Sequence, residues 1–193
     1  MLKMQGMKKR NILSLNNGRV RLRLLEHSDL PMTLGWRNKD HIRKWFFNTE
    51  IIAQEKHEEW FQDYLEKEGD YVFIIEEIVD LRKAVGQVSI YNINWEDKRG
   101  EYGRLLIGEM DAQGRGIAKE ATKLLLWYVF TELGLNRVEL EVQSNNQRAI
   151  AIYRTCGFGE ESDRNGVKKM VHRGKGLMFK REQTVGLLTM PDN

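Results

Sequence analysis

The stretch Gln113-Gly114-Arg115-Gly116-Ile117-Ala118 decides the fold, because it places two glycines between an apolar strand and a helix. Glycines let the backbone turn so that successive N–H groups converge, and the helix start adds partial positive charge. Such a loop holds an anionic oxygen without side chains, which favours a phosphate or pyrophosphate ligand. A tight turn into the helix is the alternative interpretation of the same glycines.

Two better-known phosphate loops do not match this segment. A Walker loop requires four residues between its glycines and a Lys-Ser/Thr pair, and the dinucleotide fingerprint requires a third small residue in a parallel βαβ unit. The segment is therefore another kind of phosphate loop, or only a turn.

Hydrophobic periodicity predicts helix, strand and helix after this loop. One helical face collects Ile117, Ala121, Leu124, Leu125 and Tyr128, and Gly134 is placed to end that helix. Residues 138–142 alternate apolar and polar side chains, which indicates a strand with one buried face. A second helix follows with Asn145 or Asn146 as its cap and Gly157 at its end, and its apolar face consists of Ala149, Ile152, Tyr153 and Cys156.

The segments before the loop predict a sheet with two helices. A period-two pattern indicates a strand over 19–25, and segments separated by polar stretches indicate strands over 71–75, 84–92 and 100–108, which are expected to form an antiparallel meander. A helix is expected from Ser28 or Asp29 to about Asn38, and an amphipathic helix over 53–67. Residues 168–180 are expected to supply closing strands.

Two motifs carry a resemblance to a known family. Gln113 to Ala118 matches Q-x-x-G-x-A, the acetyl-CoA pyrophosphate motif of the GNAT acetyltransferases. Residues 145–158 read NNQRAIAIYRTCGF and resemble that family's N-x-x-A-x-x-x-Y-x-x-x-G-F helix, in the expected order. The similarity covers Arg19 to about Arg181 of a chain interpreted as one domain over residues 1–193.

The resemblance implies a mixed α/β fold, with a mostly antiparallel sheet whose central strands splay apart and with flanking helices. Acetyl-CoA is the implied cosubstrate, and no metal is implied. The backbone of Leu106, Ile107 and Gly108 would bond the pantetheine arm. Gln113, Gly114, Arg115, Gly116, Ile117 and Ala118 would hold the pyrophosphate, and Asn145 would contact the cofactor. Ordinary sheet pairing is the alternative role of the strand residues.

Acetyl transfer to an amine requires a base and a proton donor. Glu101 is the candidate base, because it lies on the strand leading to the cofactor gap; a surface glutamate is the alternative. Tyr153 occupies the tyrosine of the second motif, and its phenol, with an ordinary pKa near 10, suits protonation of a departing thiolate; a core aromatic is the alternative. Cys156 lacks a His/acid partner and is not expected to be a nucleophile.

Several residues are expected near the phosphates or the acceptor. Secondary candidates for the coenzyme phosphates are the basic residues Arg115, Lys119, Arg148 and Arg154. The candidate acceptor contacts are Trp36, Arg37, Asn38, Arg43 and Trp45, because a cation beside a flat apolar ring suits a phosphate attached to a base or sugar. Helix packing and solvated arginines are the alternative.

This acceptor region resembles two GNAT branches, the RimJ/RimL-type N-terminal acetyltransferases and the amino-sugar N-acetyltransferases of pseudaminic-acid synthesis. We therefore expect a small-molecule amine, with a nucleotide-linked amino sugar preferred over a protein N-terminus. A catalytically silent acyl-CoA-binding module is the alternative of another class.

Composition limits the remaining classes. The 193 residues carry a net charge of +3, which is too small to indicate nucleic acid as the main partner. The longest apolar run, Leu124 to Phe130, is far shorter than the roughly 20 residues of a membrane span. A single cysteine and no secretion signal favour the cytoplasm, and no metal-ligand spacing is present. A homodimer is compatible with the sequence.

Overall fold

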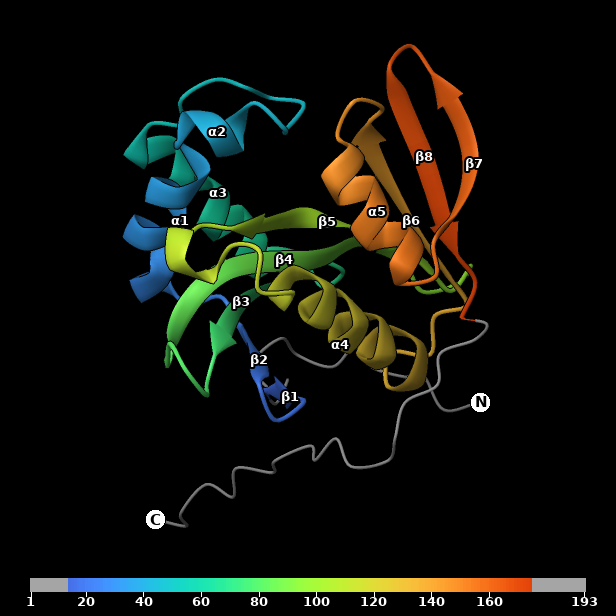
Figure 1. Ribbon diagram of the computed structural model, residues 1–193, viewed down its shortest axis with the longest axis horizontal. Helices are drawn as coiled ribbons and strands as arrows, with labels where there is room; N and C mark the ends of the chain where they lie inside the picture. The colour runs from blue at the N-terminus through green and yellow to red at the C-terminus, as the bar shows by residue number, and fades with distance from the viewer. Residues whose placement is uncertain (1–13, 175–193) are drawn as a thin grey trace.

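The computed structural model describes residues 14–174, which build a mixed sheet of eight strands in the order β1-β2-β3-β4-β5-β6-β8-β7 (Figure 1). The strands are β1 Leu15–Asn16, β2 Val20–Leu24, β3 Tyr71–Glu77, β4 Lys83–Asn94, β5 Arg99–Ile107, β6 Arg137–Gln143, β7 Gly159–Arg164 and β8 Val167–His172. The helices are α1 Leu30–Arg37, α2 Asp40–Arg43, α3 Gln54–Glu66, α4 Ile117–Thr131 and α5 Gln147–Thr155. Short 3-10 turns lie at His27–Asp29 and Met110–Ala112.

Strands β5 and β6 form the one parallel pair of the described sheet, and they separate soon after they meet. Their pairing runs from Arg99 opposite Arg137 to Glu101 opposite Glu139 and then stops. A register shift between β4 and β5 inserts one residue into β5, and Arg104 takes a left-handed backbone there, with φ 52°. A bulge bends its strand. The sheet therefore opens between β5 and β6, as the predicted fold class requires (Figure 1).

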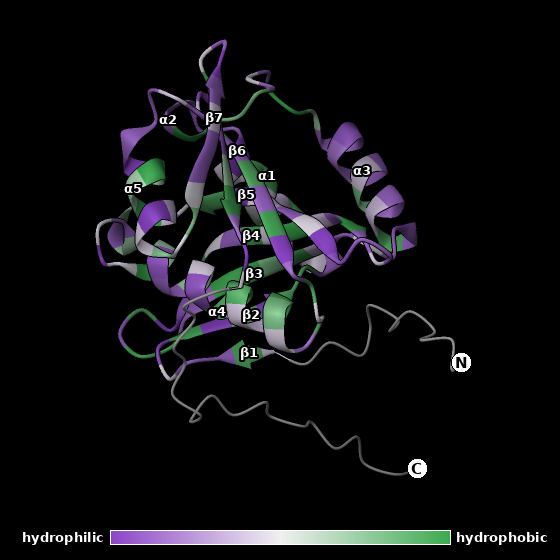
Figure 2. Cartoon of the chain, turned by 90° about the vertical axis from the view of Figure 1, so that its right-hand side faces the viewer, coloured by the Kyte–Doolittle hydropathy of each residue, from purple (hydrophilic) through white to green (hydrophobic). Residues whose placement is uncertain are grey.

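The two faces of the sheet are covered by different helices. Helices α4 and α5 pack on one face, over a large core that includes Phe73, Tyr102 and Leu125. Helices α1 and α3 cover the other face, where Phe61 and Tyr64 of α3 pack on Ile74. Figure 2 shows apolar colour on the central strands and mostly polar colour on α3. Burial of these apolar surfaces drives the layered arrangement.

The structure confirms most of the predicted elements and adds three. The meander of β3, β4 and β5 and the helices α1, α3, α4 and α5 lie within a few residues of their predicted bounds. The short elements β1, α2 and β7 were missed. Strand β7 is polar throughout and largely exposed, so it lacks the alternation that identifies a half-buried strand. The predicted closing segment begins in β8, and its part from 175 to 180 lies outside the described residues.

Candidate acetyl-CoA and acceptor site

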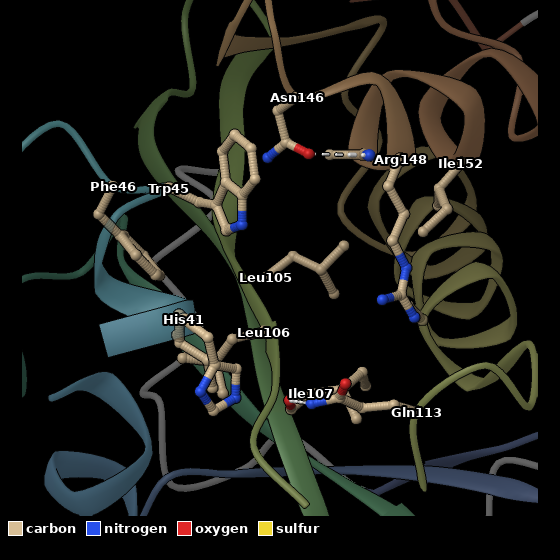
Figure 3. Close-up of a pocket in the computed structure, with 13 residues that line it drawn as sticks. His41, Trp45, Phe46, Leu105, Leu106, Ile107, Gln113, Asn146, Arg148 and Ile152 are labelled. Atoms are coloured by element: carbon tan, nitrogen blue, oxygen red, sulfur yellow. Dashed lines mark hydrogen bonds between the residues drawn. The ribbon is translucent and has the colours of Figure 1, made fainter. Parts of the chain in front are cut away.

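A cavity of about 180 Å³ lies in the opening beside β5. In Figure 3, His41, Trp45 and Phe46 from α2 and the loop after it face Arg148 and Ile152 of α5, with Leu105 between them. The complete lining is His41, Ile42, Trp45, Phe46, Leu105, Leu106, Ile107, Gln113, Ala118, Asn146, Arg148, Ala149 and Ile152. Both motif segments therefore meet at one apolar cleft with a polar end.

The glycine loop is the candidate anion site of this cleft. Gly114 and Gly116 have φ values of 77° and 78°, a left-handed backbone that glycine adopts without strain. A Cβ at either position would meet nothing within 4 Å, so the loop surface is open. Helix α4 starts directly after Gly116, and no side chain caps it. The first N–H groups of α4 are thus available to a pyrophosphate, and the residues present fit that group.

The backbone groups that were predicted to bind the pantetheine arm at the end of β5 do not all face the opening. The Gly108 N–H donates to Val85 O at 2.8 Å, and Lys39 Nζ donates to Gly108 O at 2.8 Å, so both backbone groups of Gly108 are already used. Its role as a pantetheine contact therefore stays a prediction. Because antiparallel pairs alternate, the backbone of Leu106 also faces β4, whereas the backbone of Ile107 faces the opening. Gln113 Nε2 donates to Ile107 O at 3.4 Å, which ties the loop to that strand edge.

At the start of α5 the cleft is lined by Asn146, whereas the predicted Asn145 is exposed and does not line it. The Asn146 side chain accepts from Ala149 N at 3.2 Å and caps the helix (Figure 3). Its amide nitrogen remains for a ligand. This assignment could have been made from the sequence, because the asparagine of N-x-x-A stands three residues before Ala149, at position 146.

The four secondary basic candidates do not all reach the cleft. Arg148 lines it and extends toward Gln113 in the view of Figure 3. Arg115 lies 3.9 Å from Asp80, Arg154 pairs with Glu160, and Lys119 is exposed. Arg148 is therefore the phosphate candidate of this group whose position the cavity supports.

Tyr153 lies on α5, is 8% exposed and is not among the residues that line the cleft. Its ring makes an edge contact with Tyr102 at 5.8 Å, and no described residue hydrogen-bonds its hydroxyl. Burial raises the pKa of Tyr153 above its ordinary value, and the Cys156 thiol and the Tyr91 phenol raise it further. The phenol is therefore fully protonated at neutral pH and can only give a proton.

Glu101 lies on β5 opposite Tyr91 of β4. Its Oε1 accepts from Asn92 Nδ2 at 3.1 Å. Burial and the Glu101 charge both raise the pKa of Tyr91, whose phenol also influences Tyr153. Tyr91 thus lies opposite Glu101 across the hairpin and interacts electrostatically with Tyr153. Sequence reasoning missed it, although the register of the β4–β5 hairpin would have placed it opposite Glu101.

A second and larger cavity, of about 590 Å³, lies on the α3 side of β5. Arg104 of β5 and Gln87 of β4 form its floor, and Phe46 lines both this cavity and the cofactor cleft. Its other lining residues are Thr33, Arg37, Asn48, Glu50, Ile51, Ile52, Ala53, Lys56, His57 and Trp60. The shared Phe46 makes the two cavities neighbours.

Of the five predicted acceptor contacts, Arg37 alone lines this second cavity. Trp36 is 3% exposed and packs on Gly108, which gives it a packing role, and its contact with the acceptor stays a prediction. Asn38 exchanges two 2.9 Å hydrogen bonds with the backbone of Ile52, which uses both ends of its amide. Arg43 donates to Asp40 and to Thr49 O, and Trp45 lines the cofactor cleft instead.

Other chemistries find little support in the described part of the chain. Burial raises the pKa of the Cys156 thiol to about 11, and its Sγ donates to Lys119 O at 3.7 Å, so it is a poor nucleophile. Residues 14–174 contain no cluster of three His, Cys, Asp or Glu that could hold a metal ion. Their helices include none with the length and apolar character needed to cross a membrane.

The geometry agrees with comparisons to known proteins. A family model described as an acetyltransferase (GNAT) domain matches residues 19–159. The chain belongs to the GNAT acetyltransferases. The spermidine N(1)-acetyltransferase of Escherichia coli is 31% identical over 144 residues, which cover 75% of each chain. The Bacillus subtilis protein named "Putative ribosomal N-acetyltransferase YdaF" is 28% identical over 149 residues, covering 75% of this chain and 80% of that protein.

A solved structure gives the same result for the fold. The spermidine N-acetyltransferase of Vibrio cholerae, in complex with CoA and spermine, superposes with a TM-score of 0.74 at 26% identity, covering 83% of this chain and 99% of that one. The GNAT assignment makes the chain an acetyl-CoA-dependent N-acetyltransferase. These relatives differ from the amino-sugar branch that the Trp36 region resembles.

Proposed function

We propose that this GNAT enzyme transfers the acetyl group of acetyl-CoA directly to a primary amine of a small molecule bound in the Arg37 cavity. The main support for this proposal is the pair of neighbouring cavities beside the bulged strand β5, which share Phe46. One cavity is joined to the glycine loop, and the other is large enough for a ligand of several functional groups.

Acetyl-CoA supplies the thioester when bound, and the residues of this chain manage the protons. Glu101 accepts the proton that the amine loses as its nitrogen bonds to the acetyl carbon. Tyr153 gives a proton to the sulfur as the carbon–sulfur bond breaks, so charge balances within one turnover. The protonated state of Tyr153, enforced by burial, suits this role. Tyr91 lies opposite Glu101 and interacts electrostatically with Tyr153, which supports their joint action.

Three kinds of acceptor are compatible with a GNAT enzyme of this shape. The Escherichia coli and Vibrio cholerae relatives are spermidine acetyltransferases, which favours spermidine, whereas Arg37 in the cavity suits the nucleotide-linked amino sugar expected from the sequence. A protein N-terminus finds support in the Bacillus subtilis relative, but the cavity is lined from several elements and suits a compact ligand better than an extended chain. A homodimer remains a prediction.

Free-thiol release tests the proposal. Purified protein, acetyl-CoA and a panel of amines should release CoA only with an acceptor amine present, and mass spectrometry should find one acetyl group on that amine. The Tyr153→Phe variant, which keeps the ring, is the control against background hydrolysis. Tight acetyl-CoA binding without amine-dependent thiol release, over polyamines, amino sugars and N-terminal peptides, would instead indicate a silent acyl-CoA-binding module.

A further inference from the structure

The cavity that receives the acceptor has an unusual charge balance. Three cationic side chains line it, Arg37, Lys56 and Arg104, against one carboxylate, Glu50, which belongs to an exposed residue. A polycation such as spermidine needs several carboxylates along its path, and the described lining of this cavity supplies only Glu50. The lining therefore differs from what a polyamine requires.

Two of the three cations are already neutralised. Arg104 makes a bidentate pair with Asp70, at 2.6 and 3.1 Å, and its guanidinium lies against the rings of Tyr91 and Trp60. Lys56 Nζ lies 2.7 Å from Glu59 Oε2. These pairs leave Arg37 as the cation with charge available to a ligand.

Arg37 has no carboxylate partner within residues 14–174. Its Nη2 donates to Asn48 O, and its Cζ lies 4.0 Å from the centre of the Phe46 ring. Its Nη1 is buried and has no hydrogen-bond partner in the described structure. Burial and the nearby Arg43 charge lower the pKa of Arg37, which is the mark of a cation held without a counter-charge.

A buried donor without a partner is unfavourable, and a guanidinium satisfies such donors best with a carboxylate or phosphate in bidentate geometry. Phe46 fixes the plane of the guanidinium from one side, and the stacked rings of His57 and Trp60, 5.2 Å apart, provide a flat apolar wall in the same cavity. The cavity thus combines an unpaired planar cation with aromatic surface.

We infer that the acceptor amine carries an acidic group, a carboxylate or a phosphate, and that Arg37 binds this group while the amine reaches toward β5. The inference rests on the proposed acetyl transfer and sets its substrate class. The nucleotide-linked amino sugar expected from the sequence belongs to this class, and spermidine does not.

Matched acceptors test the charge directly. Glucosamine 6-phosphate against glucosamine differs by one phosphate, and 5-aminopentanoate against 1,5-diaminopentane exchanges a carboxylate for an ammonium. The wild-type enzyme should show kcat/KM about 10- to 100-fold higher for an acidic member than for its partner, as expected for one charge-assisted contact. Comparison of the two pairs distinguishes phosphate from carboxylate. Equal use of both members, or preference for spermidine, would overturn the inference.

Substitution of Arg37 assigns the effect to this side chain. Arg37→Gln should abolish the preference for the acidic member, with a much larger loss of kcat/KM for that member than for its partner, whereas Arg37→Lys should restore part of the preference. Arg82→Gln removes the same charge from an exposed position outside the cavity and should change nothing. An equal loss for both members would mean that Arg37 only supports the Asn48 loop, and would reject the inference.

Measurement of ligand binding tests the charge preference independently of acetyl transfer. If no amine is acetylated, the proposed transfer fails, and calorimetry with glucosamine 6-phosphate and glucosamine still measures the charge preference. Arg37-dependent binding of the phosphate alone would support the anion site without transferase activity. Equal binding of both sugars would reject it.

Discussion

The indole ring of Trp36 lies so close to Gly108 that position 108 has no room for a side chain. A Cβ built on Gly108 would lie 2.1 Å from Trp36 Cγ, and the indole Nε1 donates to Glu109 at 2.7 Å. Helix α1 is thereby fixed to the end of β5, where the cofactor cleft begins. Gly108 is needed for this contact and not for its backbone N–H.

Gly108→Ala should therefore destabilise the protein. The added methyl group overpacks a rigid ring, at a cost of about 1–3 kcal/mol, and the midpoint of thermal unfolding should fall by about 3–10 °C. Gly35→Ala is the matched control, since its Cβ would meet nothing within 4 Å on α1, and alanine favours a helix. Equal midpoints for Gly108→Ala and wild type by calorimetry would contradict the packing described.

The phosphate loop is tested by two glycines at opposite ends of one helix. Gly116 and Gly134 both have positive φ, 78° and 67°, and a Cβ on either would meet open space. Valine at either position should strain the backbone by a similar amount, of order 1–3 kcal/mol. Gly116→Val alone should also weaken acetyl-CoA binding, by tenfold or more in calorimetry, because its strain falls on the anion site. An affinity loss of the same size in Gly134→Val would remove the pyrophosphate from this loop.

Features that depend on neighbouring residues could be predicted from the sequence, whereas features that depend on contacts between distant residues could not. The glycine loop and the two helices after it are local: each depends on spacing within a few residues, so they could be predicted. The acceptor side depends on distant contacts. Asn38 is held by Ile52, fourteen residues later, and the role of Trp36 is set by Gly108, far along the chain. Neither hydrophobic periodicity nor composition predicts these two contacts.

The partners of charged side chains also could not be predicted from the sequence. In the predicted acceptor contacts, Arg37 and Arg43 look equivalent, yet Arg43 is paired with Asp40 whereas Arg37 lines the cavity. The segment Gly159–Arg164 lacks apolar side chains, yet it pairs as a strand with the adjoining β8, where its carboxylates contact Lys168. Only the folded arrangement shows which charges have partners.

Stability should fall as the pH drops from about 7 to 5, because burial lowers the pKa of both His57 and His172 below the ordinary value. The unfolded chain then binds protons more readily than the folded chain. The stabilising contribution is therefore complete above the unfolded pKa of about 6.5 and is lost as the pH falls below it. The lowered carboxylate pKa values of Glu160, Glu161 and Asp163 act only at more acidic pH.

His172→Asn isolates one of these groups. His172 Nδ1 accepts from Gly174 N at 2.9 Å, and an asparagine oxygen can accept in its place without titrating. The variant should be less stable overall, because ring contacts with Phe130 are lost, but its unfolding midpoint should vary less between pH 7 and 5. An unchanged slope in thermal scans would show that His172 does not contribute.

Glu101→Gln should change the acidic limb of the pH–rate profile. If Glu101 takes the amine proton, kcat/KM should lose its dependence on that carboxylate and fall by about 10²-fold. Glu139→Gln is the matched control: Glu139 is opposite Glu101 in the parallel pair, but it is paired with Arg137 and Lys169. It should affect stability more than the profile. Identical profiles for Glu101→Gln and wild type would leave the base unassigned to this residue.

Tyr153→Phe should lower kcat by about 10²-fold while leaving acetyl-CoA affinity and the unfolding midpoint nearly unchanged, because the ring and its contact with Tyr102 remain. The raised pKa of Tyr153 adds a second expectation: no loss of rate from its ionisation should appear below the ordinary tyrosine range near pH 10. Single-turnover measurements separate chemistry from product release. A variant as fast as wild type in the chemical step would exclude Tyr153 as the donor, and the sulfur would then take its proton from solvent through the open cleft.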